Sequence, residues 1–273
     1  MQIVRNPFVF IGMIALSAAL ILSLFSEFTS DTVKKNKEDD KKKNILLARF
    51  FEEAEDPNSK TISALSNPSD LMEIYDLEIQ ELLYNEDDGS AILDEVDFSK
   101  LVWKENKKDG SMYYFFKGGD SFKRYLPLFK VKGDDGGYIV PISGKGLWST
   151  IKGFIYIVPE NKGIYIVKGI SFYEHGETPG LGGEIDVYDV KKRYVNKKID
   201  INNKKTPEMV KAVSDKSYEL EYISGATITS DGLNDFIASH VLGRYKTILL
   251  EVNWWTRYFQ TQSIMRILSL NKF

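Results

Sequence analysis

Residues 224–230, SGATITS, combine small and hydroxyl-bearing side chains at a junction between a predicted strand and a predicted helix. Small side chains let backbone N–H groups approach a ligand, and the first turn of a helix adds unsatisfied N–H donors and partial positive charge. The segment therefore has the features of a phosphate-binding turn with several hydroxyls beside the anion. The alternative is an ordinary junction in which Thr229 or Ser230 caps the helix.

A second segment, residues 174–183, has the sequence EHGETPGLGG. Four glycines and a proline in ten residues indicate a shaped loop, whose backbone amides could lie along a flat polar ring system. A long hairpin turn would explain the glycines, but it would not explain His175, Glu177 and Leu181.

The third segment, residues 141–149, has the sequence PISGKGLWS. Its Gly-Lys-Gly run is too short for a P-loop and lacks the P-loop spacing. Trp148 suits stacking on an aromatic cofactor, although a buried core tryptophan is the commoner role.

In the order SGKGLW, EHGETPGLGGE and SGATITS, behind one apolar N-terminal span, these segments closely resemble the C subunits of the sodium-translocating NADH:quinone oxidoreductases. The resemblance runs from that span to about His240. It implies a domain that carries FMN covalently, through a phosphoester between the flavin phosphate and a threonine of the SGAT motif, here Thr227. The other cofactor-binding residues that it implies are Ser224, Gly225 and Ala226 at the phosphate, Trp148, Thr178, Pro179, Gly180 and Leu181 at the isoalloxazine, Lys145 near its pyrimidine end, and Glu177.

The resemblance also implies a function. The chain would relay electrons through FMN within a membrane complex that exports sodium, with the other subunits of that complex as its partners and a separate flavin transferase for its maturation. We find no dinucleotide fingerprint and no candidate general base, so we expect no catalytic residue in this chain and place NADH oxidation and quinone reduction in other subunits.

Three alternatives stay open at this point. The first is the homologous FMN subunit of a ferredoxin-linked ion-translocating complex, whose glycine-rich loop is much alike. The second is a hydrolase with Ser224 or Thr227 as nucleophile and His175 or His240 as base, although no G-x-S-x-G elbow is present. The third is a membrane-anchored binding module without a cofactor.

Composition narrows the chemistry further. The 273 residues include no cysteine and only two histidines, so thiolate metal sites, disulfides and thiol nucleophiles are excluded and we expect no metal site. A net charge of −3 also excludes a dominant basic surface for nucleic acid.

The elements that must position these segments begin with a membrane span. The 21 residues 6–26 are uncharged and predict one transmembrane helix, longer than the apolar region of a cleaved signal peptide. Six lysines between residues 34 and 43 favour a cytoplasmic domain by the positive-inside rule. The resemblance instead implies the outer, periplasmic face of the cell inner membrane, and we adopt that orientation.

After the span we expect a single α+β domain with antiparallel strands. The predicted organisation is an anchor (1–30), a charged juxtamembrane linker and helical region (31–99), the FMN-binding domain (100–248) and an aromatic tail (249–273). A helix is predicted over 70–83 with Ser69 or Asp70 as its cap, and residues 70–97 hold eleven acidic residues and no basic one. Strands are predicted at 112–116 and 218–223, a hairpin at 153–158 and 163–172, and a helix from Ser230 with Leu233, Phe236, Ile237 and Val241 on one face.

Overall fold

The computed structural model describes residues 7–56, 58–92, 100–117, 123–133 and 136–252. The chain forms two compact units, Met1–Lys41 and Lys42–Phe273. The aromatic cluster predicted in the tail, which includes Trp254 and Trp255, lies outside the described residues.

The predicted apolar span lies in helix α1 (Pro7–Arg49), which continues without a break through the stretch expected as a linker. Among the described residues, α1 is the one helix long and apolar enough to cross a membrane, and an 18-residue window in it reaches a mean hydropathy of 2.6. None of that window is buried within the protein, and large apolar side chains such as Leu16 and Leu24 are exposed. An exposed apolar helix of this length suits a hydrocarbon environment.

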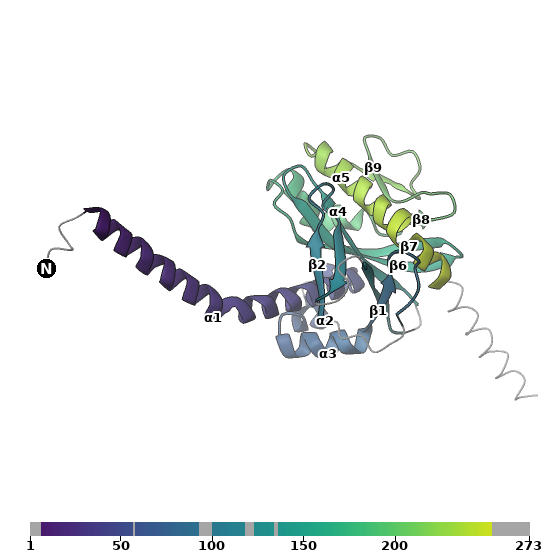
Figure 1. The fold of residues 1–273 in the computed structure, drawn as a ribbon. Helices are drawn as coiled ribbons and strands as arrows, with labels where there is room; N and C mark the ends of the chain where they lie inside the picture. The colour runs from purple at the N-terminus through teal and green to yellow at the C-terminus, as the bar shows by residue number, and fades with distance from the viewer. Residues whose placement is uncertain (1–6, 57, 93–99, 118–122, 134–135, 253–273) are drawn as a thin grey trace, which may run out of the picture. The chain divides into compact units, whose positions relative to one another are not determined.

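The second unit is built on an antiparallel sheet (Figure 1). The strand order is β2-β3-β4-β5-β6-β7-β8, and β1 pairs with β4 outside this path. The strands are β1 (Ile79–Asn85), β2 (Leu101–Glu105), β3 (Met112–Phe116), β4 (Tyr125–Val131), β5 (Tyr138–Lys145), β6 (Thr150–Asn161), β7 (Ile164–Glu174) and β8 (Lys198–Asp200). A small parallel pair, β9 (Glu208–Val210) and β10 (Glu219–Glu221), lies apart from this sheet.

Helices cover the sheet because its side chains alternate between two hydrophobic cores. On β5, Val140 and Ile142 face one core together with the apolar residues of α5 (Thr227–Ala238). Ile139, which precedes Val140, faces the other core, with the end of α1 and with α3 (Pro68–Glu78). The remaining helices are η2 (Glu53–Glu55), α2 (Lys60–Ala64), η4 (Gly182–Asp186), α4 (Tyr188–Lys192) and η5 (Ser239–Arg244).

Most of the expected elements are confirmed, with one clear correction. The hairpin is β6–β7, the strand at 112–116 is β3, and the predicted apolar face of α5 is buried. The helix predicted over 70–83 is wrong in its second half, because it ends at Glu78 and Ile79 begins strand β1, paired with Val131 of β4. Its cap is Asn67, whose side chain accepts from the Ser69 N–H, with Pro68 in the first turn.

Candidate functional site

Two glycines bring helix α5 against the end of strand β5. A Cβ atom on Gly144 would lie 2.3 Å from the Cβ of Phe236, and one on Gly232 would lie 2.2 Å from the backbone oxygen of Lys145. These approaches are closer than any side chain would allow. They place the helix that follows the SGAT turn directly beside the SGKGLW segment.

Glu177 joins all three of the predicted segments. Its side chain is 4% exposed. Oε1 accepts from the N–H groups of Trp148 (3.0 Å) and Ser149 (3.1 Å), and Oε2 accepts from that of Leu147 (3.1 Å). The hydroxyl of Thr229 on α5 donates to the same Oε2 at 2.7 Å. Glu177 was predicted only as a cofactor-binding residue, and these contacts were not foreseen because their partners lie 28 to 52 residues away.

Burial and hydrogen bonding act in opposite directions on the pKa of the Glu177 carboxyl group. Burial alone would raise the pKa of Glu177, but the hydrogen bonds from Thr229 and from three backbone amides lower it below its ordinary value. The group is therefore a carboxylate at neutral pH.

The SGAT turn presents Thr227 to solvent. Thr227 is the first residue of α5 and is exposed, as are Ser224 and Gly225, whereas Ala226 is buried. Gly225 has a φ of +72°, which only glycine adopts readily, and its open side faces a methyl group of Leu181. The turn therefore lies against the glycine-rich loop.

The first turn of α5 has no side-chain cap, so the alternative in which Thr229 or Ser230 caps it is wrong. Ala226 stands at the cap position and makes no side-chain hydrogen bond. The Thr229 hydroxyl donates to Glu177, and the Ser230 hydroxyl donates to the backbone oxygen of Ala226. The N–H groups of this turn thus have no side-chain acceptor, and they lie beside the exposed Thr227 hydroxyl.

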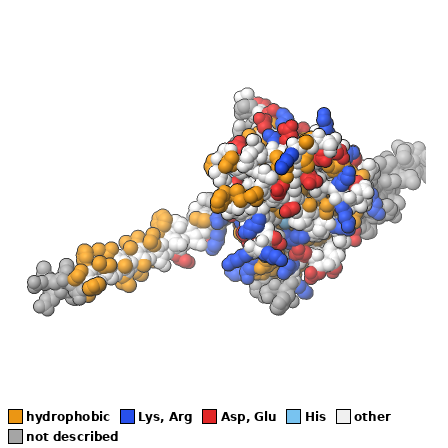
Figure 2. Space-filling view, turned by 90° about the horizontal axis from the view of Figure 1, so that it is seen from above, with side chains coloured by type: hydrophobic (Ala, Val, Ile, Leu, Met, Phe, Trp, Pro, Cys, Tyr) orange, Lys and Arg blue, Asp and Glu red, His pale blue; other side chains and the backbone are white. Residues whose placement is uncertain are grey.

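Four large apolar residues of the three segments are exposed rather than packed into the core. Trp148 is 71% exposed, Ile228 58%, and Leu147 and Leu181 nearly half, so a core role for Trp148 is excluded. Figure 2 shows hydrophobic side chains on the surface of the second unit, among charged ones. Large apolar groups held at a surface are typical of a site that binds a ligand or a partner.

The cation expected at the site, Lys145, is partly neutralised. Its Nζ lies 3.5 Å from Glu105 Oε1 and 3.2 Å from the hydroxyl of Thr150, which itself donates to Glu105 at 2.6 Å. Thr178, Pro179 and Gly180 lie on the glycine-rich loop, and all three are exposed.

Neither histidine is placed as a catalytic base. His175 Nε2 lies 2.6 Å from Asp186 Oδ2, and its Nδ1 accepts from the N–H of Glu177. His240 is buried, with Nδ1 at 2.8 Å from the backbone oxygen of Phe236 and Nε2 at 3.3 Å from Arg244. Both rings have both nitrogens engaged, so the hydrolase alternative has no free imidazole to activate Ser224 or Thr227.

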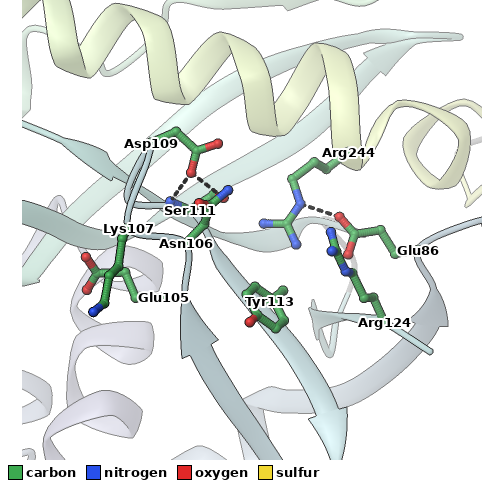
Figure 3. A pocket seen from close by; sticks show the side chains of 9 residues that line it. All are labelled: Glu86, Glu105, Asn106, Lys107, Asp109, Ser111, Tyr113, Arg124 and Arg244. Atoms are coloured by element: carbon green, nitrogen blue, oxygen red, sulfur yellow. Dashed lines mark hydrogen bonds and ion pairs between the residues drawn. The ribbon is translucent and has the colours of Figure 1, made fainter. Parts of the chain in front are cut away.

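A polar cavity of about 490 Å³ lies next to these segments, between the β2–β3 turn and η5 (Figure 3). Inside it, Arg244 Nε donates to Glu86 Oε1 at 2.6 Å, and the Arg124 guanidinium lies 5.0 Å from the centre of the Tyr113 ring. No residue of the three segments lines the cavity. One lining residue, Glu105, contacts the SGKGLW segment through its ion pair with Lys145.

Comparison with known proteins confirms the resemblance and the fold class. Residues 146–240 match the model of the FMN-binding domain family. The C subunit of the Na(+)-translocating NADH-quinone reductase from Neisseria meningitidis serogroup A is 40% identical over 126 residues, 44% of this chain and 48% of that protein. The protein of the same name from Pasteurella multocida is 27% identical over 230 residues, 82% of this chain and 84% of that protein. Apart from the Pasteurella protein, the chain spans about half the length of the curated relatives it matches.

Solved structures share the fold. The C subunit of the Na(+)-translocating NADH-quinone reductase from Parabacteroides distasonis superposes with a TM-score of 0.57 at 24% identity, covering 81% of this chain and 96% of that one. Shewanella oneidensis NqrC superposes with a TM-score of 0.52, also at 24% identity, covering 67% and 88%.

Proposed function

We propose that this chain is the FMN-carrying electron-transfer subunit of a membrane sodium-translocating NADH:quinone oxidoreductase, with FMN attached by a phosphoester to Thr227. The single observation that carries the proposal is the junction at Glu177. One buried carboxylate ties the SGKGLW loop, the glycine-rich loop and α5 together, and the Thr227 hydroxyl remains exposed at an uncapped helix start. The match of residues 146–240 to the FMN-binding domain family supports the choice of cofactor.

The residues of the site fit an FMN phosphate. The start of α5 would hold the phosphate of an FMN attached to Thr227, because the N–H groups of its first turn and the helix dipole stabilise negative charge. Gly225 allows close approach because it has no side chain. The SGAT turn, with an exposed hydroxyl at a helix N-terminus, is therefore suited to a covalently held phosphate.

Other residues would shape the surroundings of the ring. Trp148 and Leu181 offer exposed apolar surface that would keep water from one side of it. Lys145 brings positive charge, which its contact with Glu105 moderates. FMN supplies the redox chemistry when bound, and the protein sets its orientation and its potential.

The proposal includes partners and a location. The relatives are named as subunits of a quinone reductase, so we propose that the other subunits of that complex are the partners of this chain. A flavin transferase would attach FMN. Helix α1 would anchor the chain in lipid of the inner membrane, with the second unit on the outer face.

The test is the fate of the flavin in denatured protein. Chain purified from its native membrane is expected to fluoresce on a denaturing gel and to carry the mass of one FMN less one water. Thr227→Ala is expected to lose both signals and Thr227→Ser to keep them, while Thr206→Ala, outside the three segments, serves as the control. An unmodified native chain, or a Thr227→Ala variant that keeps its flavin, would refute the covalent site.

A further inference from the structure

Glu177 is more fully engaged than a ligand-binding carboxylate needs to be. Three consecutive backbone N–H groups, those of residues 147–149, converge on it, and the hydroxyls of Ser149 and Thr229 donate to it as well. Successive amides that point at one anion form a nest, in which the negative charge fixes the conformation of the loop. The carboxylate thus replaces a bound anion as the centre of this loop.

The neighbouring backbone is shaped around the same carboxylate. A Cβ atom on Gly146 would lie 2.6 Å from Glu177 Oε1, and one on Gly182 would lie 2.9 Å from Oε2 and 2.6 Å from the Thr229 hydroxyl. Glycine at both positions leaves the space that the carboxylate and the hydroxyl occupy. The SGKGLW loop and the glycine-rich loop are therefore both fitted to Glu177.

The loop residues that hydrogen-bond to the Glu177 carboxylate lie at the protein surface and not in the core. Leu147 is 46% exposed and Trp148 is 71% exposed. An exposed loop of this kind has few apolar contacts to order it, so its hydrogen bonds decide its conformation.

We infer that Glu177 is a positioning residue that orders the loop carrying Trp148 against helix α5 before flavin is attached. The part of this inference that concerns flavin rests on the proposed function. Glu177 would act through the loop and not by contact with the ring, because five donors already share its two oxygens. Its direct consequence is a preformed stacking surface next to Thr227.

The test uses the full chain in detergent and begins without flavin. The parent is Thr227→Ala, to which Glu177→Gln is added. Hydrogen exchange of the backbone amides of residues 147–149 is expected to become about tenfold faster or more. The reason is that the NH2 group of the new glutamine is itself a donor and cannot accept from these amides. The control is Glu184→Gln, a carboxylate of the adjoining helix η4 whose side chain has no hydrogen bond in the part of the chain that the structure describes. Unchanged exchange in Glu177→Gln would overturn the inference.

A second variant guards against a folding defect. Thr229→Val removes only one of the donors and keeps the shape of the side chain, so exchange at residues 147–149 is expected to rise less than in Glu177→Gln. If Glu177→Gln fails to fold, the inference is decided by Thr229→Val, and unchanged exchange in that variant overturns it.

The flavin arm uses chains with Thr227 intact. Glu177→Gln is expected to carry less covalent FMN than wild type and to show a shifted flavin absorption spectrum, whereas Glu184→Gln matches wild type in both. Faster exchange together with an unchanged flavin yield and spectrum would refute the positioning role while the proposed function stands. Absence of covalent flavin from the wild type would refute the proposed function, and the exchange experiment alone would then decide whether Glu177 orders the loop.

Discussion

Replacing Gly232 with alanine tests the packing that places α5 at the site. Gly232 lies in the interior of α5, where alanine is favoured over glycine by about 1 kcal/mol on helix propensity alone. Propensity therefore predicts a more stable protein. The structure predicts the reverse, because the new methyl group would lie 2.2 Å from the backbone oxygen of Lys145.

The magnitude follows from the size of this overlap. A carbon and an oxygen atom cannot approach to 2.2 Å, and neither the methyl group nor the backbone of β5 can rotate away, so α5 must move outward. Overpacking of this kind costs about 1–3 kcal/mol or more. Because the overlap is with backbone, we expect the upper end of this range; less the propensity gain of about 1 kcal/mol, the free energy of unfolding should fall by about 2 kcal/mol, and the Tm by about 4–8 °C for a unit of this size.

The assay is thermal and urea unfolding of the full chain in detergent, in the flavin-free Thr227→Ala background. Gly243→Ala is the matched control, since Gly243 is also helical but a Cβ atom there meets nothing within 4 Å. This control is expected to be as stable as the parent or more stable by about 0.5–1 kcal/mol. A Gly232→Ala protein that equals or exceeds its parent in stability would refute the close packing of α5 on Lys145.

Two further predictions concern pH and orientation. Burial, and then the nearby charge of Arg244, lower the pKa of His240 from 6.5 to about 4. Between these values the unfolded chain binds a proton that the folded chain does not, so the free energy of unfolding should fall by about 3 kcal/mol as the pH drops from 6.5 to 4. Urea titrations across this range are expected to show that His240→Gln removes most of this slope, and an unchanged slope would contradict the assignment. Protease added to spheroplasts is expected to cleave the second unit, whereas complete protection would place it in the cytoplasm.

Local pattern predicted α5 and the strands β3, β6, β7 and β10, because their burial follows from neighbouring residues. The β6–β7 hairpin is two apolar runs joined by a turn, and Gly163 in that turn has a φ of +73°. The end of α3 could not be predicted in this way. Ile79 continues the helical spacing of apolar residues, but its pairing with Val131 of β4, more than 50 residues away, outweighs helix propensity.

The candidate site was predicted in its parts but not in its connections. The three segments carry strong local signals, and Thr227, Trp148 and Glu177 were all named from sequence. The role of Glu177 as their junction depends on pairings with Trp148 and Thr229, which no local spacing reveals. The Asn67-Pro68 pair was a readable helix start, which the expectation of a cap at the two following positions missed.

The junction at Glu177 also bears on the order in which the protein folds. Contacts between residues so far apart in sequence form late, because large loops must close before such contacts can stabilise anything. Strands β6 and β7, which lie between the segments, have to pair before Glu177 can reach the amides of residues 147–149. An enzyme that recognises the assembled turn around Thr227 would therefore modify only chains that have completed this step. Attached flavin would then mark a finished fold, and newly made or misfolded copies of the chain would lack it.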